Sequence, residues 1–150
     1  MAFIDKDTPV GHRFVGKPKK MSWERIWAFS GGPLAFQEWP KKNLHTDPEF
    51  ARSLGLPTIC VSATQYLGHM VELMLYLFGE AWLRNGKMTN IKLPRLVKDG
   101  DVITSKARVV KREESGSGIK YDLEIIVENQ DGEKVLVGQA TGVVSARGTI

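Results

Sequence analysis

The chain has 150 residues, of which 42% are hydrophobic and 25% charged, and this composition fits a single soluble domain, residues 1–150, with a sizeable core. Its formal net charge of +4 is spread over small groups of basic residues, so we expect neither a nucleic-acid partner nor a membrane-binding tract. The single cysteine excludes an intrachain disulfide and a zinc site built on cysteine pairs, and we expect no metal.

The N-terminal part of the sequence predicts short elements. Its first residues lack the apolar core of a signal peptide, so we expect a cytoplasmic protein. Val10–Val15 predicts an edge strand, and Ser22 is a suitable N-cap for a helix that ends near Phe29. Leu34–Lys42 has no clear period and predicts a surface loop. This loop contains Trp39, which we expect to pack as part of a wall or lid.

A polar loop leads into the second predicted helix. Thr46 or Asp47 is a good N-cap, and Pro48 fits the first helical turn because its missing N–H costs nothing there. We expect this helix to end near Gly55. His45 lies just before the helix, where a histidine is either a functional group or a loop residue bonded to the backbone.

The longest predicted element is an apolar helix from about Ile59 to Phe78, ended by Gly79. A polar stripe runs along it at spacings of three and four residues, made of Ser62, Gln65, His69, Glu72 and Tyr76. Such a helix is roughly 30 Å long, enough to span a bilayer. Because the polar stripe is costly in lipid, we interpret the segment as a buried helix of a soluble protein.

The remaining residues alternate in the manner of antiparallel strands. The predicted strands are Lys87–Leu96, Val102–Val110, Ile119–Glu128 and Val135–Ser145. Turns separate them at residues 98–101, 113–118 and 129–133, the last with an Asp-Gly hairpin signal. Together these elements predict an α+β fold, in which a curled antiparallel sheet of about four strands wraps a long central helix.

Three segments resemble the MaoC-like (R)-specific enoyl-CoA hydratases and dehydratases of the hotdog fold. They are HTDPEFA from His45 to Ala51, KLPRLVKDGD from Lys92 to Asp101, and the pattern Gly132…Val135…Gly138-Gln139-Ala140. The match covers about residues 10 to 145. The resemblance implies a hotdog fold, with the Ile59–Phe78 helix inside the sheet, and a homodimer whose active sites lie at the subunit interface.

The resemblance also implies that His45 is the principal acid/base. In the family an upstream aspartate helps this histidine to activate water, but the corresponding position here is Pro40 or, with a shift of one residue, Lys41. The nearest upstream carboxylate is Glu38, which is the candidate replacement. Asn43 is either a positioning group of the site or an ordinary turn asparagine.

The family binds the thioester oxygen with a backbone N–H near the start of the long helix, where this chain has Ser62 and Ala63. An alanine N–H serves equally if the backbone can approach the ligand. The resemblance therefore implies that Ser62 and Ala63 bind substrate, and Gln65 and Trp39 are further candidates.

Two other groups leave alternatives open. His69 and Glu72, three residues apart, are either a metal or acid/base pair or part of a solvated stripe. Cys60, at a predicted helix start, is either a nucleophile or a small buried side chain.

The resemblance implies a hydratase or dehydratase that acts on a 2-enoyl/3-hydroxyacyl thioester of coenzyme A or a carrier protein, as in fatty acid or polyketide metabolism, without a cofactor. One alternative is a hotdog thioesterase. Another is a non-catalytic, acyl-thioester-binding subunit of a heteromeric hydratase, which the missing aspartate favours. We expect a homodimer or a higher homo-oligomer.

Overall fold

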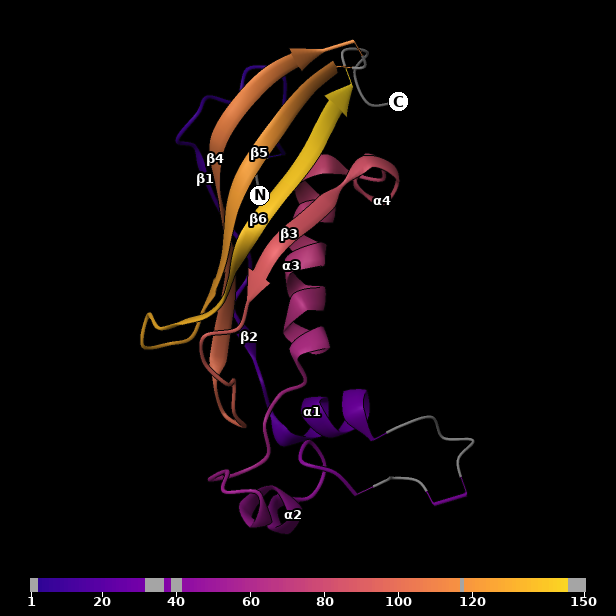
Figure 1. Ribbon diagram of the computed structural model, residues 1–150, viewed down its shortest axis with the longest axis vertical. Coiled ribbons are helices and arrows are strands. Elements are labelled where there is room, and N and C mark those ends of the chain that lie inside the picture. Colours follow the sequence, from indigo (N-terminus) through magenta and orange to yellow (C-terminus); the bar gives the residue numbers. More distant parts are fainter. Residues whose placement is uncertain (1–2, 32–36, 39–41, 117, 146–150) are drawn as a thin grey trace.

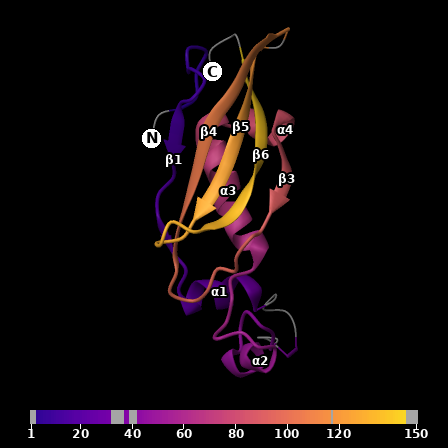
Figure 2. The same ribbon diagram turned by 60° about the vertical axis from the view of Figure 1, so that its left-hand side comes forward.

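The computed structural model describes residues 3–31, 37–38, 42–116 and 118–145. A long antiparallel sheet forms one layer, and helix α3 (Ala63–Phe78) lies along one of its faces (Figures 1 and 2). Two short helices, α1 (Trp23–Ser30) and α2 (Pro48–Ser53), lie beyond the N-terminal end of α3. The predicted α+β fold, with a long helix against a curled antiparallel sheet, is confirmed.

The sheet has six strands, in the order β1-β4-β5-β6-β3, with β2 paired to β4. The strands are β1 (Arg13–Val15), β2 (Lys19–Lys20), β3 (Lys87–Lys92), β4 (Val102–Ser115), β5 (Gly118–Glu128) and β6 (Lys134–Ser145). All their pairings are antiparallel. The long strands alternate apolar and polar side chains, so one face packs inward while the other meets solvent.

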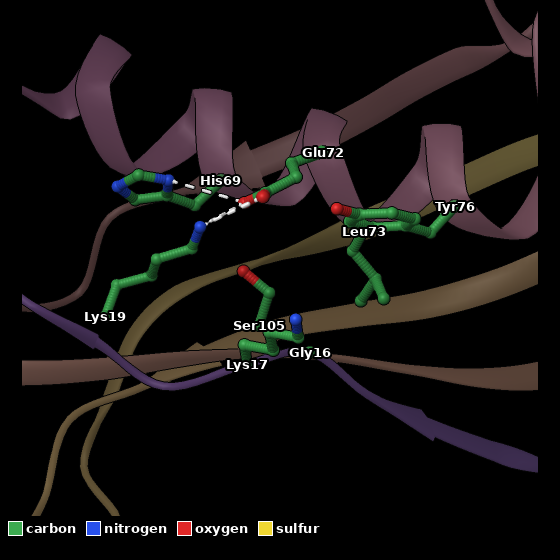
Figure 3. Close-up of a pocket in the computed structure, with 8 residues that line it drawn as sticks. All are labelled: Gly16, Lys17, Lys19, His69, Glu72, Leu73, Tyr76 and Ser105. Atoms are coloured by element: carbon green, nitrogen blue, oxygen red, sulfur yellow. Dashed lines mark hydrogen bonds and ion pairs between the residues drawn. The ribbon is translucent and has the colours of Figure 1, made fainter. Parts of the chain in front are cut away.

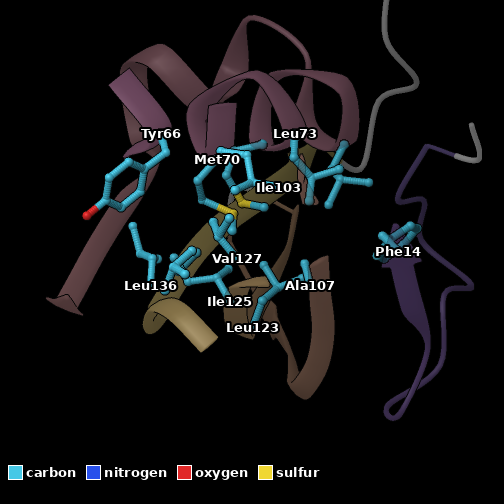
Figure 4. Close-up of a cluster of buried hydrophobic side chains, with 14 of the residues drawn as sticks. Phe14, Tyr66, Met70, Leu73, Ile103, Ala107, Leu123, Ile125, Val127 and Leu136 are labelled. Atoms are coloured by element: carbon cyan, nitrogen blue, oxygen red, sulfur yellow. The ribbon is translucent and has the colours of Figure 1, made fainter. Parts of the chain in front are cut away.

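The hydrophobic core lies between α3 and the sheet. Met70 and Leu73 of α3 face the inward side chains of the sheet, as Figure 4 shows. The inward side chains of β5 are completely buried, namely Tyr121, Leu123, Ile125 and Val127. Burial of one large apolar side chain stabilises a fold by roughly 1.5–3 kcal/mol. This helix–sheet contact therefore holds the N-terminus of α3 in a defined place.

Helix α3 starts later than predicted. The sequence suggested a helix from about Ile59, whereas α3 has 16 residues and begins at Ala63. The preceding residues are extended, because Val61 N donates a hydrogen bond to Val97 O at 2.8 Å. This long-range pairing removes one turn from the predicted helix. No helix in the described ranges is long and apolar enough to cross a membrane.

Three details of the sheet also differ from the prediction. β4 continues to Ser115 instead of ending near Val110, since the turn into β5 begins only at Gly116. β3 pairs with β6 and not with β4, so the C-terminal strands are not a simple meander. The predicted strand Val10–Val15 is shortened to β1.

The short helices are weakly anchored. All residues of α1 are described, and Ile26 is the only one of them that is buried. Trp23 and Trp27 stack on each other, with ring centroids 5.8 Å apart. In α2 the buried residue is Ala51. A further helix, α4 (Ala81–Asn85), was not predicted. Few core side chains therefore hold α1 and α2 to the rest of the fold.

Candidate functional site

Asn43 holds the loop before α2 in shape. Its Oδ1 accepts a hydrogen bond from His45 N at 2.8 Å, and its carbonyl oxygen accepts from the N–H groups of Thr46 and Asp47, each at 3.0 Å. Such a turn is closed by its own side chain. Asn43 Nδ2 also donates to Ser30 O at 3.1 Å, so the loop is tied to the last residue of α1.

Asp47 fixes the other end of the loop. As the predicted N-cap of α2, it accepts hydrogen bonds at Oδ1 from Glu49 N and Phe50 N, each at 2.9 Å. The bond from Phe50 N holds the pKa of the Asp47 carboxyl below its usual value. The Asp47 carboxylate is thus occupied by the first N–H groups of α2. His45 lies between Asn43 and Asp47, whose hydrogen bonds fix the backbone on both sides of it.

The side chain of His45 reaches the extended segment before α3. His45 Nδ1 lies 2.7 Å from Cys60 O, and Cys60 N donates to Leu44 O at 3.3 Å. A carbonyl oxygen can only accept, so Nδ1 carries the proton in this contact. In the neutral ring Nε2 is then unprotonated and can act as a hydrogen-bond acceptor or a base.

Cys60 supports His45 and has the properties of a buried thiol. Its side chain is 4% exposed, and its Sγ is 3.6 Å from His45 Nδ1. Burial raises the pKa of the Cys60 thiol, which disfavours the nucleophilic thiolate. The geometry therefore favours the structural alternative for this cysteine.

The N-terminus of α3 follows shortly after Cys60. Ser62 is the N-cap residue, and its Oγ pairs with Thr64 Oγ1 at 2.8 Å instead of capping the helix. The first N–H groups of an α-helix have no acceptor within the helix. Ala63 is the first residue of α3, so its N–H and the positive end of the helix dipole are suited to bind a partial negative charge.

Within the described residues, no carboxylate contacts the His45 ring. Glu38, the candidate replacement for the missing aspartate, lies in a turn and is exposed. Trp39, the candidate wall of the substrate site, lies outside the described residues, as do Pro40 and Lys41. The structure thus joins Asn43 to His45 and His45 to Cys60, which precedes Ser62 and Ala63 in the chain, and it leaves Glu38 exposed in a turn.

Gln65, another predicted substrate-binding residue, packs between α3 and α1. Its side chain is 8% exposed, and Nε2 donates to Arg25 O at 3.3 Å. Its Oε1 is buried and has no hydrogen-bond partner among the described residues. Gln65 therefore joins α1 to the first turn of α3.

His69 and Glu72 belong to a charged cluster further along α3 (Figure 3). Lys19 Nζ lies 2.8 Å from Glu72 Oε2, and His69 Nδ1 lies 3.8 Å from the same oxygen. Burial lowers the pKa of His69, and the charge of Lys19 acts in the same direction. In the part of the chain that the structure describes, no three His, Cys, Asp or Glu side chains are grouped so that they could hold a metal ion.

Two contacts of the site were missed by sequence reasoning. His45 is oriented by the carbonyl of Cys60, and Asn43 is bound to the carbonyl of Ser30. Every residue has such a carbonyl, so no residue type in the sequence marks these partners. The resemblance located the histidine but not the groups that orient it.

No protein-family model matches this chain, and no curated protein matches it. Several solved structures are similar. A MaoC-like dehydratase from Rhodospirillum rubrum is 21% identical, with 99% of this chain and 100% of that chain covered and a TM-score of 0.75. The (R)-hydratase from A. caviae involved in PHA biosynthesis is 18% identical, with 93% and 99% covered and a TM-score of 0.69.

A heteromeric assembly is also similar. The ChsH1-ChsH2 complex from Mycobacterium tuberculosis contains a chain that is 16% identical, with 91% of this chain and 98% of that chain covered and a TM-score of 0.67. At these identities the likeness establishes the fold. The chain therefore has the hotdog fold found in MaoC-like dehydratases and (R)-hydratases, as the resemblance implied.

Proposed function

We propose that this protein is a hydratase/dehydratase that interconverts a 2-enoyl thioester and the corresponding 3-hydroxyacyl thioester. The contact of His45 Nδ1 with Cys60 O at 2.7 Å carries the proposal, because it leaves Nε2 free as a base on a ring that is held to the segment leading into α3. A base for water and an N–H donor for the thioester oxygen are what this addition requires. The shared hotdog fold supports the same function.

In the hydration direction, His45 Nε2 removes a proton from water while the water oxygen bonds to C3. The π electrons of the C2–C3 bond shift towards the carbonyl, so negative charge develops on the thioester oxygen. Ala63 N–H stabilises that charge at the positive end of α3. The imidazolium of His45 then gives its proton to C2, and one water has been added. Dehydration follows the same steps in reverse.

The remaining candidates support this step. Asn43 positions His45 through the bond to its N–H, while Ser62 and Trp39 contribute to the substrate site. His45 acts alone, or it uses Glu38 or a group of a second subunit in a homodimer. Loss of an acid/base partner costs about 10²–10⁴ in rate, so turnover without one is slow. The thioester is carried by coenzyme A or by a carrier protein.

A second candidate function is that of a non-catalytic subunit in a heteromeric hydratase. The family aspartate is replaced by Pro40 or Lys41. One of the similar structures, the ChsH1-ChsH2 complex, is built from two different chains. In this alternative the chain binds the acyl thioester at the N-terminus of α3, and a partner with a complete Asp-His pair does the chemistry. The base-competent orientation of His45 favours the catalytic proposal.

The test measures hydration of crotonyl-CoA and of longer 2-enoyl-CoA thioesters by the purified protein and two variants. His45→Gln removes the base, and His12→Gln is the matched control, since His12 is exposed and contacts Phe14 at a ring-centroid distance of 4.7 Å. We expect His45→Gln to lower kcat by at least about 10²-fold with nearly unchanged binding of butyryl-CoA. His12→Gln should match the wild type. A loss of similar size in Glu38→Gln would identify Glu38 as the partner of His45.

Three outcomes separate the alternatives. If the wild type binds acyl thioesters but hydrates none, the hydratase proposal fails and the subunit proposal replaces it. Co-purification with a second hotdog chain that carries the full motif would support that replacement. If the wild type binds no acyl thioester, both proposals fail.

A further inference from the structure

The polar stripe of α3 contains buried atoms that the proposed chemistry does not use. Three buried side-chain atoms have no hydrogen-bond partner among the described residues, namely Ser30 Oγ, Gln65 Oε1 and His69 Nε2. Ser30 ends α1, and Gln65 is bonded to α1 through Arg25 O. Gln65 and His69 lie four residues apart, on the same side of α3. Buried polar atoms are nearly always paired in proteins, so the two unpaired atoms that lie on α3, Gln65 Oε1 and His69 Nε2, require an explanation.

Two of the unpaired atoms are hydrogen-bond acceptors. Gln65 Nε2 donates to a carbonyl, which orients the amide with Oε1 as the acceptor. His69 Nδ1 faces the carboxylate of Glu72 at 3.8 Å, beyond hydrogen-bond distance, and this negative charge favours the tautomer with the proton on Nδ1, which leaves Nε2 of the neutral ring as an acceptor. Burial, aided by Lys19 and Arg25 and opposed by Glu72, lowers the pKa of His69 and so favours the neutral ring.

A ligand that satisfies both acceptors needs hydrogen-bond donors and no negative charge at this place. A carboxylate or phosphate would face two acceptors, and the nearby cation Lys19 is already paired with Glu72 at 2.8 Å. An apolar acyl chain would leave both acceptors unpaired. The Cβ atoms of residues four apart on a helix are separated by roughly 5–6 Å. Two amide nitrogens joined through two methylene carbons and a carbonyl lie about 5 Å apart when the chain is extended.

We propose that Gln65 Oε1 and His69 Nε2 form a subsite for the two amide N–H groups of a pantetheine arm, which coenzyme A and carrier proteins share. This inference rests on the hydratase proposal, which places the thioester at Ala63 N–H. From there the arm runs along α3 towards its C-terminus. Gln65 accepts from the amide nearer the thioester, and His69 accepts from the amide one helical turn further on.

Helix α1 covers the Gln65 end of this subsite and moves to admit the arm. Both acceptor atoms are buried, and α1 contacts Gln65 through the carbonyl of Arg25. Displacement of α1 exposes one core side chain, Ile26. The segment before α1 stays in place, because Lys19 Nζ lies 2.8 Å from Glu72 Oε2 (Figure 3).

The test uses three butyryl thioesters that do not react and that differ only in the arm. The S-ethyl thioester has no amide, the N-acetylcysteamine thioester has the nearer amide, and the pantetheine thioester has both. Dissociation constants are measured for the wild type, Gln65→Met and His69→Leu. Gln139→Met is the matched control, since Gln139 is exposed on β6. Butyryl-CoA and a butyryl carrier protein show whether the effect is the same for both carriers.

The two variants have different expected patterns. Gln65→Met weakens binding of the N-acetylcysteamine and pantetheine thioesters about tenfold, and His69→Leu weakens the pantetheine thioester alone by a similar factor. Neither variant changes binding of the S-ethyl thioester, and Gln139→Met changes none. Thermal unfolding checks that each variant is folded, and Gln65→Leu replaces Gln65→Met if the latter is not.

Several outcomes would overturn the subsite. If a variant weakens binding of all three thioesters equally, the mutated side chain contacts the acyl part of the ligand. If neither variant changes any dissociation constant, the two unpaired atoms have only a structural role. In both cases hydration of 2-enoyl thioesters by the wild type would leave the hydratase proposal standing. If the wild type binds none of the thioesters, the hydratase proposal fails together with the subsite.

Discussion

Gly142 of β6 leaves room for the ring of Phe78, and we predict that Gly142→Ala destabilises the fold. A Cβ atom built at Gly142 would lie 2.6 Å from Cε1 and Cζ of Phe78 and 2.8 Å from Cδ1. Phe78 is 8% exposed and stacks on Trp82, with ring centroids 5.7 Å apart. The ring therefore cannot move away from the new methyl group without disturbing this aromatic pair.

The size of the effect follows from the overlap at Phe78. Carbon atoms in contact lie about 3.5–4.0 Å apart, so either the ring or β6 must shift by about 1 Å. Overpacking of a well-packed core costs about 1–3 kcal/mol. For a chain of 150 residues each kcal/mol corresponds to roughly 2–4 °C in Tm, so the expected decrease in Tm is roughly 2–12 °C.

Gly68→Ala provides the matched control within α3. No atom lies within 4 Å of a Cβ built at Gly68, and an alanine in an exposed helix interior is about 1 kcal/mol more favourable than a glycine. Thermal and urea unfolding of the two variants should therefore show shifts of opposite sign. A Tm of Gly142→Ala equal to that of the wild type would refute the close packing of β6 against the end of α3.

Two further predictions concern pH dependence and the N-terminal segment. Burial lowers the pKa of His69 from its usual 6.5, so the imidazole binds a proton more tightly in the unfolded state than in the folded state. The free energy of unfolding therefore falls as the pH drops from about 6.5 through the lower pKa of the folded state. Between about pH 7.5 and about pH 5, urea unfolding should show a smaller loss of stability for His69→Gln than for the wild type. Equal losses would contradict the lowered pKa of His69. Tyr121→Phe should lower the free energy of unfolding by about 1 kcal/mol, because Tyr121 OH donates to Asp5 O at 2.7 Å. Faster proteolysis before β1 would accompany this loss, and an unchanged urea midpoint would show that the bond does not hold the N-terminal segment.

Local patterns in the sequence determined most of the elements. The alternation in Ile119–Glu128 predicted β5 almost to its ends, since every second side chain is buried in the core. Asp47-Pro48 located the start of α2, because capping depends on groups within one helical turn. The resemblance likewise identified the segment that contains His45 and the fold that surrounds it.

Only the tertiary structure decided where α3 begins and how His45 is oriented. The apolar residues before Ala63 have the period of a helix, yet their backbone pairs with the segment at Val97. His45 Nδ1 is bound by the carbonyl of Cys60, fifteen positions along the chain. A backbone carbonyl has no residue-specific signature, and its partner is set by the three-dimensional path of the chain. The unpaired acceptors of Gln65 and His69 became visible in the same way, because the burial of both atoms distinguishes them from a solvated stripe.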